Sequence, residues 1–425
     1  MAKLRRRRSQ ALRTKPLVSL FELALFASLQ TEEGQPTFAT LACIDPDRPD
    51  PKPPKRIRPQ RWQYSRFGEP FPLTVSNLSK FSKVVGPRAS ALAVYPDAGD
   101  NWTAWGLIDQ GFNWSEFVEY ESSGGFDPPG EFIVTLEGPG TISVSRGYAL
   151  IASLRRGTLL SKFFEVFEKG PVFRHLEKCA EELIETIERQ YAVKIQDVRK
   201  RNGVSADLRS GFRYEMISTL RRILIISQSY RHGAAFVILP SEPTSGLNIK
   251  YPLRYDRIPK LLSEHARLGP GLLDAHQKVF DIYEKGQSTL PTQIHREIAI
   301  GEAEQRDAEE ALAGCVRTVA ATSQVDGVVA VNRSLEVIGF GAEITEGQKP
   351  RCIFSAEDEE GSKKLLKPLD YEHYGTRHRS MLRLCNSCPG SIGFVISQDG
   401  DIRAMCKAGD AVLVWSNIQV RESFT

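Results

Sequence analysis

The sequence lacks several features that would assign it at once to a specialised class of protein. No apolar run reaches the roughly 20 residues that a membrane-spanning helix needs, because the best candidate, residues 17–29, is shorter and contains Glu22. That segment also lacks the small-residue cleavage site of a signal peptide. We therefore expect no membrane span, and we interpret residues 17–29 as an amphipathic helix docked on the first domain.

Cysteine is also scarce and irregularly spaced. The chain has 7 cysteines in 425 residues, an odd number that does not suggest a disulfide framework and favours a reducing compartment, so we expect a cytoplasmic protein. Cys385 and Cys388 have the CxxC spacing of zinc sites, but zinc takes about four ligands and no second pair lies at a suitable interval. We interpret both as core or turn thiols.

A large net charge is absent, yet the positive charge is unevenly distributed. The formal net charge is +4 at pH 7, and the first 15 residues hold seven basic side chains: Lys3, Arg5, Arg6, Arg7, Arg8, Arg13 and Lys15. Such a run is typical of a solubilising tail, although contact with anionic lipid or nucleic acid is an open alternative. A DNA-contacting scaffold would show steep salt dependence, but we do not expect nucleic acid as the partner.

The N-terminal half divides into an arm and a β-rich region. Residues 1–60 end in a stretch dense in proline and charge, which favours extended polyproline conformation. Residues 61–170 carry short apolar runs separated by turn residues, which predict a β-rich domain: 91–95, 103–108, 132–136 and 148–152. Trp102, Trp105 and Trp114 are candidates for a ligand pocket in this region or, alternatively, for its core.

Helical spacing follows, and then a second domain. Apolar residues three or four apart predict a connecting helix over 173–201 within a linker at 171–203. Residues 204–425 then alternate between helical and strand patterns, with helices expected at 206–230 and 298–321 and strands expected at 234–239, 325–331, 338–342, 393–397 and 402–405. The fold class we predict is α/β: a C-terminal mixed sheet covered by helices, preceded by a β-rich α+β domain. The polar residues 345–367 predict a surface insertion.

Two short motifs in this second domain point to phosphate chemistry. Gly375-Thr376-Arg377-His378-Arg379 places two guanidinium groups around an imidazole after a glycine, and Asp326-Gly327 stands in an apolar strand. Arginine donates paired hydrogen bonds to phosphate oxygens, and a carboxylate can hold the divalent metal that accompanies ATP. Together the motifs indicate a nucleoside triphosphate site.

These motifs, with Arg231-His232-Gly233-Ala234 at an opening strand, resemble the diadenylate cyclase domain over about residues 208–415. That family is marked by an HGA-like strand, an Asp-Gly-Ala motif and a Gly-Thr-Arg-His-Arg motif, and its members join two ATP molecules into cyclic di-AMP. The resemblance implies an ATP substrate, Mg²⁺ or Mn²⁺ as cofactor, and a homo-oligomer in which two cyclase domains meet face to face, because each domain holds one ATP.

The resemblance also implies a role for each matching residue. Asp326 would hold the metal and help to activate the ribose 3′-hydroxyl, with Arg377 and Arg379 as the other catalytic residues, holding phosphates. The substrate-binding residues would be Gly327, Val328, Gly375, Thr376, His378 and Ser397. His378 would orient the arginine pair or contact phosphate. His232 is not expected to be catalytic.

The chain departs from the family pattern at three places, the first of which is the segment 345–367, because it lengthens the span between the two main motifs. Val328 stands where the family has alanine, and the family's Ser-Glu-Glu-Thr-Gly-like turn appears as the shorter Ser397-Gln398-Asp399-Gly400. The leading hypothesis is nevertheless a diadenylate cyclase. The position of residues 61–170 ahead of the cyclase-like domain resembles the arrangement in which a sensor domain, here with an unknown small-molecule signal, controls a synthase. The alternative is a degenerate sensor that binds ATP or cyclic di-AMP without turnover. Asp326 as an ordinary hairpin residue, and the two arginines as a helix-start ion cluster, are the structural alternatives.

Overall fold

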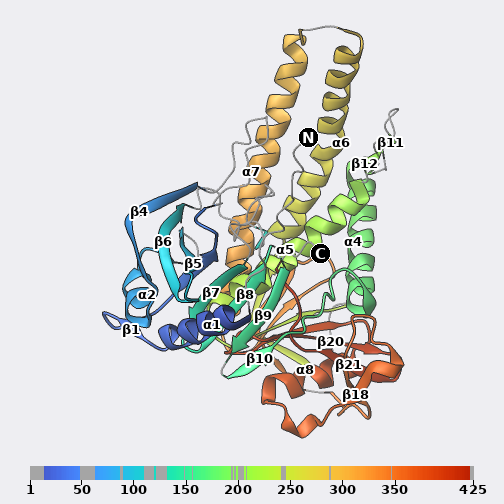
Figure 1. The fold of residues 1–425 in the computed structure, drawn as a ribbon. Helices are drawn as coiled ribbons and strands as arrows, with labels where there is room; N and C mark the ends of the chain where they lie inside the picture. Colours follow the sequence, from blue (N-terminus) through green and yellow to red (C-terminus); the bar gives the residue numbers. More distant parts are fainter. Residues whose placement is uncertain are drawn as a thin grey trace. The chain divides into compact units, whose positions relative to one another are not determined.

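The computed structural model describes residues 14–47, 63–86, 90–109, 119–120, 132–147, 149–155, 157–192, 195, 198–199, 205–206, 208–240, 246–286, 289–345 and 347–421. The chain divides into two compact units, the first up to Lys162 and the second from Phe163 to Arg421. Figure 1 shows the elements of both units coloured along the chain. Each unit is built around its own mixed β-sheet.

The first unit contains an eight-stranded sheet among its described residues, in the order β10-β9-β8-β7-β3-β5-β6-β4. Its strands are β3 (Ala39–Cys43), β4 (Gln63–Pro72), β5 (Ser90–Pro96), β6 (Trp102–Asp109), β7 (Phe132–Gly138), β8 (Thr141–Arg146), β9 (Ala149–Arg155) and β10 (Thr158–Leu160). Among these described strands, β3 and β5 form a parallel pair and all other neighbours are antiparallel. A separate short hairpin joins β1 (Thr31–Glu32) to β2 (Gln35–Pro36).

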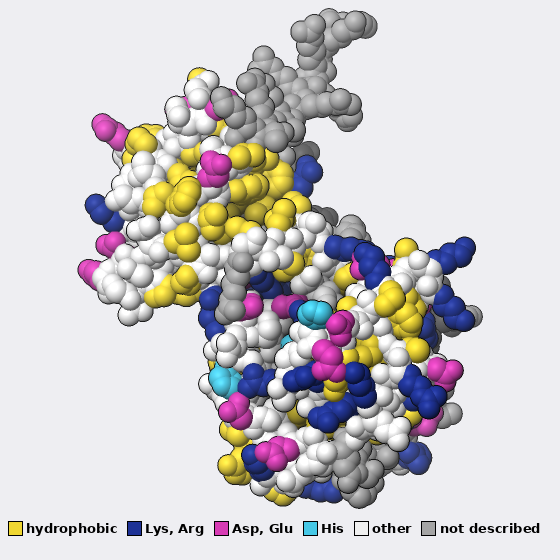
Figure 2. Space-filling model, turned by 90° about the horizontal axis from the view of Figure 1, so that it is seen from below, with side chains coloured by type: hydrophobic (Ala, Val, Ile, Leu, Met, Phe, Trp, Pro, Cys, Tyr) yellow, Lys and Arg dark blue, Asp and Glu magenta, His cyan; other side chains and the backbone are white. Residues whose placement is uncertain are grey.

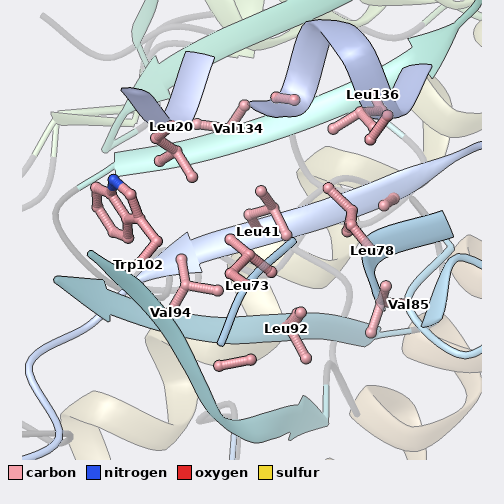
Figure 3. Close-up of a cluster of buried hydrophobic side chains, with 14 of the residues drawn as sticks. Leu20, Leu41, Leu73, Leu78, Val85, Leu92, Val94, Trp102, Val134 and Leu136 are labelled. Carbon is pink, nitrogen blue, oxygen red and sulfur yellow. The ribbon is translucent and has the colours of Figure 1, made fainter. Parts of the chain in front are cut away.

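The core of the first unit lies between this sheet and two helices, α1 (Thr14–Ser28) and α2 (Val75–Phe81). Figure 3 shows Leu20 of α1 and Leu78 of α2 lying with Leu41, Val94 and other apolar side chains of the sheet. Helix α2 begins at a cap in which the Thr74 hydroxyl accepts from the backbone amide of Asn77. Burial of these apolar side chains is the dominant stabilising term for such a unit.

The second unit contains a nine-stranded sheet among its described residues, in the order β14-β16-β15-β13-β19-β20-β21-β17-β18. Its strands are β13 (Ala234–Ile238), β14 (Leu247–Tyr255), β15 (Val328–Val331), β16 (Val337–Ile344), β17 (Ile353–Ala356), β18 (Leu366–Pro368), β19 (Ile392–Ile396), β20 (Ile402–Ala408) and β21 (Ala411–Trp415). The pairs β13–β15 and β17–β21 are parallel and the others are antiparallel.

The second unit also contains helices, which alternate with its strands along the sequence. They are α4 (Gly170–Tyr191), α5 (Leu208–Ser229), α6 (Arg257–Glu284), α7 (Thr292–Thr322) and α8 (Thr376–Ser387), with 3-10 turns η1 (Lys363–Leu365) and η2 (Tyr371–His373) and a small hairpin of β11 (Val198–Arg199) and β12 (Ser205–Ala206). Figure 1 shows α6 and α7 running side by side as a long pair. None of the helices in the described ranges is both long and apolar enough to cross a bilayer.

Helix α8 is held close to the sheet, and this contact positions the candidate site. Met381 and Cys385 of α8 are fully buried in a cluster with Ala235 of β13 and Val395 of β19. A β-carbon added to Gly393 in β19 would lie 2.3 Å from Cγ of Met381. Glycine at this strand position therefore permits the close approach of the helix.

Most of the predicted elements are present. The four apolar runs of the N-terminal region form β5, β6, β7 and β9, and the expected strand pairs of the C-terminal region form the antiparallel hairpins β15–β16 and β19–β20. The described parts of the chain are thus α/β with mixed sheets, as expected.

Four expectations differ from the structure. The predicted helix 173–201 ends at Tyr191. The predicted insertion 345–367 is not confined to the surface, because β17 and most of β18 come from it and extend the sheet. The predicted strand 325–331 begins only at Val328, which leaves Asp326 and Gly327 before it. Residues 1–60, interpreted as an arm, contain the fully buried central strand β3.

Candidate functional site

The three motif segments meet at one edge of the sheet of the second unit. Strands β13 and β15 are parallel neighbours, so the residues before them, Gly233 and Asp326, lie at the same end. Helix α8 begins at the same place, with Gly375 as its N-cap residue. Segments about 90 and 140 residues apart in the sequence are therefore brought together by the parallel strand pair and by α8.

An ion pair joins the two principal motifs. Nη2 of Arg377 donates a hydrogen bond to Oδ1 of Asp326 at 2.7 Å. The Asp326 side chain is 85% exposed and that of Arg377 is 35% exposed, so water screens the pair and it contributes no more than about 1 kcal/mol. Either group can therefore exchange its partner for a ligand at little cost.

The third motif, at Gly233, packs its backbone against the guanidinium group of Arg377. A β-carbon added to Gly233 would lie 2.3 Å from Nη1 of Arg377 and 3.5 Å from the carbonyl oxygen of Ile396. The arginine thus lies directly against the backbone before β13, where any side chain would displace it. His232 is half-buried, and its Nδ1 has no hydrogen-bond partner.

Gly327 is required by its backbone conformation. Its φ of +122° is in the region that favours glycine, and an added β-carbon would lie 2.5 Å from the carbonyl carbon of Gly341. Before this turn, the Asp326 side chain is exposed to solvent. After it, Val328 is the first residue of β15, is buried and pairs with Ala342. Val328, expected to bind substrate, belongs to the core cluster.

The N-terminus of α8 is open. Gly375 and Thr376 are exposed, no side chain caps this end, and nothing lies within 4 Å of an added β-carbon at Gly375. The first amide groups of a helix lack partners within the helix and carry the positive end of its dipole. This end of α8 therefore offers hydrogen-bond donors to an anion.

Arg379 lies in a second ion cluster, away from Asp326. Nη1 of Arg379 is 3.4 Å from Oε2 of Glu372, whose other oxygen accepts from Lys349 at 2.7 Å. Lys349 also lies over the ring of Tyr371, 4.9 Å from its centroid. The two motif arginines consequently point to different carboxylates.

His378 faces the protein interior. Its Nε2 accepts from Nη1 of Arg403 at 3.2 Å, and its ring lies 5.4 Å from that of Tyr374. Burial, together with the positive charges of Arg403 and Arg377, lowers the pKa of His378 to about 4. The imidazole is therefore neutral at pH 7 and acts here as an acceptor for Arg403.

The turn after β19 is closed by internal hydrogen bonds. The Ser397 hydroxyl accepts from the amide of Asp401 at 3.1 Å, and the Ser397 amide donates to the carbonyl oxygen of Asp401 at 2.8 Å. The Asp401 carboxylate pairs with Nε of Arg403 at 2.8 Å and accepts from the amide of Asn417 at 3.0 Å. Gln398 is exposed.

Two residues of this region were missed by the sequence analysis. Arg403 links the turn to α8, and only its place in the otherwise apolar run 402–405 could have indicated it. Tyr251 of β14 is exposed, stacks on Phe340 at 5.1 Å and lies against Gly341, the neighbour of Gly327. Its exposed aromatic ring therefore lies beside the close contact between Gly327 and Gly341.

The metal-ligating potential of the site rests on Asp326. Among the residues that the structure describes, no group of three or more His, Cys, Asp or Glu side chains could hold an ion by itself. Mg²⁺ is commonly held by one or two carboxylates together with substrate phosphates, and the exposed Asp326 carboxylate fits that kind of site. Cys385 of the CxxC pair is fully buried, and its Sγ lies 3.6 Å from the carbonyl oxygen of Met405.

The tryptophans expected near a ligand in the first unit belong to its core. Trp102 and Trp105 are buried, and their indole N–H groups donate to the carbonyl oxygens of Pro16 and Ile44 at 2.7 and 2.9 Å. The core alternative is therefore the correct one for these two. Trp114 lies outside the described residues.

Comparison with known proteins gives one finding for the first unit. Residues 8–109 match a family described as "Probable sensor domain DACNV", which confirms a sensor region in the N-terminal part but starts it inside the segment interpreted as an arm. No curated protein matches the chain. Residues 8–109 thus correspond to a probable sensor domain, and the second unit carries an arginine and a carboxylate side chain that both reach solvent.

Proposed function

We propose that the second unit is a diadenylate cyclase domain, which converts two ATP molecules into cyclic di-AMP and two pyrophosphates. The observation that carries the proposal is the meeting of Gly233, Asp326 and Arg377 beside the open N-terminus of α8. Each of these three short motifs is weak evidence for a function when taken alone. Together their residues form one cluster of the groups that suit a metal and a nucleotide.

The triphosphate would bind at the start of α8. Backbone amides at a helix N-terminus favour phosphate, and the exposed Thr376 hydroxyl adds a donor. Arg377 would exchange its single hydrogen bond to Asp326 for two parallel hydrogen bonds to phosphate oxygens, which is the geometry that its planar guanidinium group favours. Tyr251 offers a ring on which a purine can stack.

Asp326 would then be free for the divalent ion. Mg²⁺ or Mn²⁺ held between this carboxylate and the phosphates would neutralise charge that develops on the pyrophosphate leaving group. The chain's own part is to hold the triphosphate through α8 and Arg377, and to place Asp326 where it can accept a hydrogen bond from a ribose 3′-hydroxyl.

The reaction requires two such sites. Each 3′-oxygen attacks the α-phosphorus of the other ATP, the bond to pyrophosphate breaks with its electron pair going to the leaving group, and the hydroxyl protons pass to water. One domain carries a single Asp326 and Arg377 cluster, so two chains would meet face to face. The probable sensor domain would control this meeting in response to its signal.

One observation favours the alternative of a nucleotide receptor without turnover. In the turn Ser397–Gly400, the family's first acidic residue is replaced by Gln398, and Asp401 is already engaged with Arg403 and Asn417. A site with fewer available carboxylates can bind a nucleotide without positioning the metal for reaction.

The test is incubation of the purified chain with ATP and Mg²⁺ or Mn²⁺, followed by mass spectrometry for cyclic di-AMP. Nucleotide binding is measured in parallel by calorimetry. We expect product from the wild-type chain and none from Arg377→Ala/Arg379→Ala. The matched control is Arg174→Ala, which removes an exposed arginine paired with Glu360 at 2.9 Å elsewhere in the same unit and should retain activity.

The outcomes separate the two functions. Binding without product would support the receptor and reject the cyclase. Neither binding nor product from a folded chain would reject both. Equal loss of activity in the Arg174→Ala control would show that the assay reports general damage to the unit.

A further inference from the structure

The chain enters the second unit as a short segment that is packed inside that unit. The first unit reaches Lys162, and residues 163–167, called the entry segment below, follow directly. Its side chains Phe164, Val166 and Phe167 are 6%, 0% and 2% exposed. Connections between compact units normally run through exposed linkers with few contacts. The burial of the entry segment therefore indicates a part in the second unit itself.

The backbone of the entry segment is bonded to residues near the end of the chain. Phe164 forms a parallel bridge with Ile418. The Phe164 amide donates to the carbonyl oxygen of Asn417 at 3.1 Å, and the Phe164 carbonyl oxygen accepts from the amide of Gln419 at 2.8 Å. The Ile418 amide donates in turn to the carbonyl oxygen of Ile402 in β20 at 3.0 Å. The bridged residues thus join the entry segment to β20.

A buried aromatic stack anchors the other end of the entry segment. The rings of Phe167 and Phe394 are stacked, with centroids 5.8 Å apart, and the Arg221 guanidinium lies 4.8 Å from the centroid of Phe167. Arg221 also pairs with Glu165 and is only 4% exposed, whereas Figure 2 shows many Lys and Arg side chains on the surface of the second unit. These contacts hold the entry segment against β19, whose last residue precedes Ser397.

Asn417 links the entry segment to the candidate site. Its carbonyl oxygen accepts from Phe164, and its amide donates to Oδ1 of Asp401 at 3.0 Å. The other carboxylate oxygen of Asp401 pairs with Arg403, which donates to His378 of α8. A continuous series of hydrogen bonds and one ion pair therefore connects the entry segment to α8 and to the turn after β19.

The backbone conformation of Asn417 makes this link sensitive to substitution. Its φ of +54° lies in the left-handed region, which glycine and asparagine tolerate and β-branched residues avoid. In this conformation the amide and the carbonyl group of one residue reach two different partners. A residue that avoids the conformation would weaken both hydrogen bonds without changing any group that contacts the proposed substrate.

We propose that the entry segment is a positioning element of the candidate site: through Asn417 it holds Asp401, and thereby the turn after β19 and Arg403 beside His378. Its effect on the reaction rests on the proposed cyclase function, but the positioning of the turn does not. Because the entry segment directly follows Lys162, a displacement of the chain at the end of the first unit would reach the turn through these contacts.

The experiment compares substitutions of Asn417 in the full chain. Asn417→Val should raise the hydrogen-exchange rates of amides in residues 397–403 about tenfold or more. It should also lower the rate of cyclic di-AMP formation at saturating ATP about fivefold or more, with less than about a twofold change in the dissociation constant of ATP, because the triphosphate contacts proposed for Arg377 do not involve the turn. Asn417→Gly tolerates the conformation and should behave as the wild type, and Asn417→Ala should be intermediate.

A double-mutant cycle tests the link to the entry segment. Phe167→Leu removes the stack on Phe394 and should raise the same exchange rates. If both residues act through one route, the double variant Phe167→Leu/Asn417→Val should exchange more slowly than the product of the two single effects. Phe280→Leu is the matched control, because Phe280 is 47% exposed on α6, and it should leave these exchange rates unchanged.

Circular dichroism melting checks that each variant is folded, and Asn417→Ala serves as the test if Asn417→Val does not fold. Unchanged exchange in the turn would overturn the proposal, as would equal effects of Asn417→Gly or fully multiplicative effects in the cycle. Faster exchange with an unchanged rate of synthesis would reject the role of the entry segment in the reaction. A wild-type chain without product would reject the cyclase, while the exchange rates would still decide whether the entry segment positions the turn.

Discussion

At the residue scale, the ion pair between Arg377 and Asp326 joins two groups that the proposed reaction uses separately. Both side chains reach solvent, so the pair is weak, and each group has a separate ligand in the proposed complex. The carboxylate therefore competes with phosphate for the guanidinium group until a metal engages it.

Asp326→Asn should raise the affinity for ATP in the absence of metal, by roughly threefold to fivefold, because it removes the partner that phosphate must displace. The same variant should lose cyclic di-AMP synthesis, since an amide is a poor ligand for the metal. Calorimetry in EDTA and product analysis by mass measure the two effects. Asp274→Asn, which changes an exposed carboxylate on α6, should alter neither. Weaker metal-free binding would contradict this role of Asp326.

Gly233→Ala should weaken ATP binding about tenfold or more, because the new methyl group would occupy the position of the Arg377 guanidinium. The fold should persist, since the displaced atoms are the end of a flexible side chain. Gly211→Ala is the matched control: Gly211 lies in α5 with nothing within 4 Å, so this change should leave binding intact and slightly favour the helix. Unchanged binding in Gly233→Ala would show that Arg377 does not contact the nucleotide.

Arg403→Met should raise the pKa of His378 from about 4 toward its ordinary value, because one of the nearby positive charges is removed. NMR titration of the histidine ring signals, with His378→Gln for assignment, measures this shift. Arg174→Met should leave the His378 pKa unchanged. A His378 pKa that stays near 4 in Arg403→Met would assign the whole shift to burial and to Arg377.

The sequence predicted the positions of these motif residues better than their contacts. Asp326, Gly327 and the residues from Gly375 to Arg379 could be recognised because each type has a distinct chemistry at a short spacing. The contact between His378 and Arg403 could not, because it depends on how β20 lies beside α8. Gly233 likewise shows its role only when the Arg377 side chain is placed against it.

At the scale of elements, one half-buried histidine joins three helices of the second unit. His265 of α6 contacts Glu215 of α5 and Glu309 of α7. Burial alone would lower the pKa of His265, but the hydrogen bonds and charges of both glutamates raise it to about 10. The imidazolium thus ties the long helical pair to α5 at neutral pH.

The folded-state pKa of His265 lies above the unfolded value near 6.5, so the stabilisation is complete below about pH 6.5 while both glutamates are ionised. It should be lost as the pH rises from about 6.5 to 10, lowering the free energy of unfolding by a few kcal/mol. Urea unfolding between pH 6 and pH 10 tests this, with His265→Leu as the variant that should lack this dependence. A wild-type stability that stays level over this range would contradict the assignment.

Sequence patterns located the short apolar strands and most long helices, but they missed helix α6 and several strands, among them β8 and β14. Runs such as 91–95 and 234–239 are short, apolar and bounded by turn residues, so they could be identified as strands. Helix α6 was missed because Gly269-Pro270-Gly271 interrupts its pattern, which normally signals a helix end. Strands β17 and β18 lie at one end of the sheet order, in a polar segment without the alternation of an apolar strand.

At the scale of the whole molecule, the chain combines a probable sensor domain with a unit proposed to act on nucleotides. Each unit has its own sheet and core. A conformational change in the probable sensor domain therefore does not require the second unit to unfold. The proposed reaction joins two nucleotides, and each chain provides one Asp326 and Arg377 site. Control of the encounter between two chains is therefore the simplest way in which a sensor could regulate synthesis.

The most direct test of this account is the rate of cyclic di-AMP formation from ATP, measured by mass spectrometry over a hundredfold range of protein concentration. The account predicts that the rate per milligram of protein rises with concentration and then levels off as face-to-face pairs form. A folded chain that binds ATP but makes no cyclic di-AMP at any concentration would contradict it, and so would a rate per milligram that is constant for a demonstrably monomeric protein.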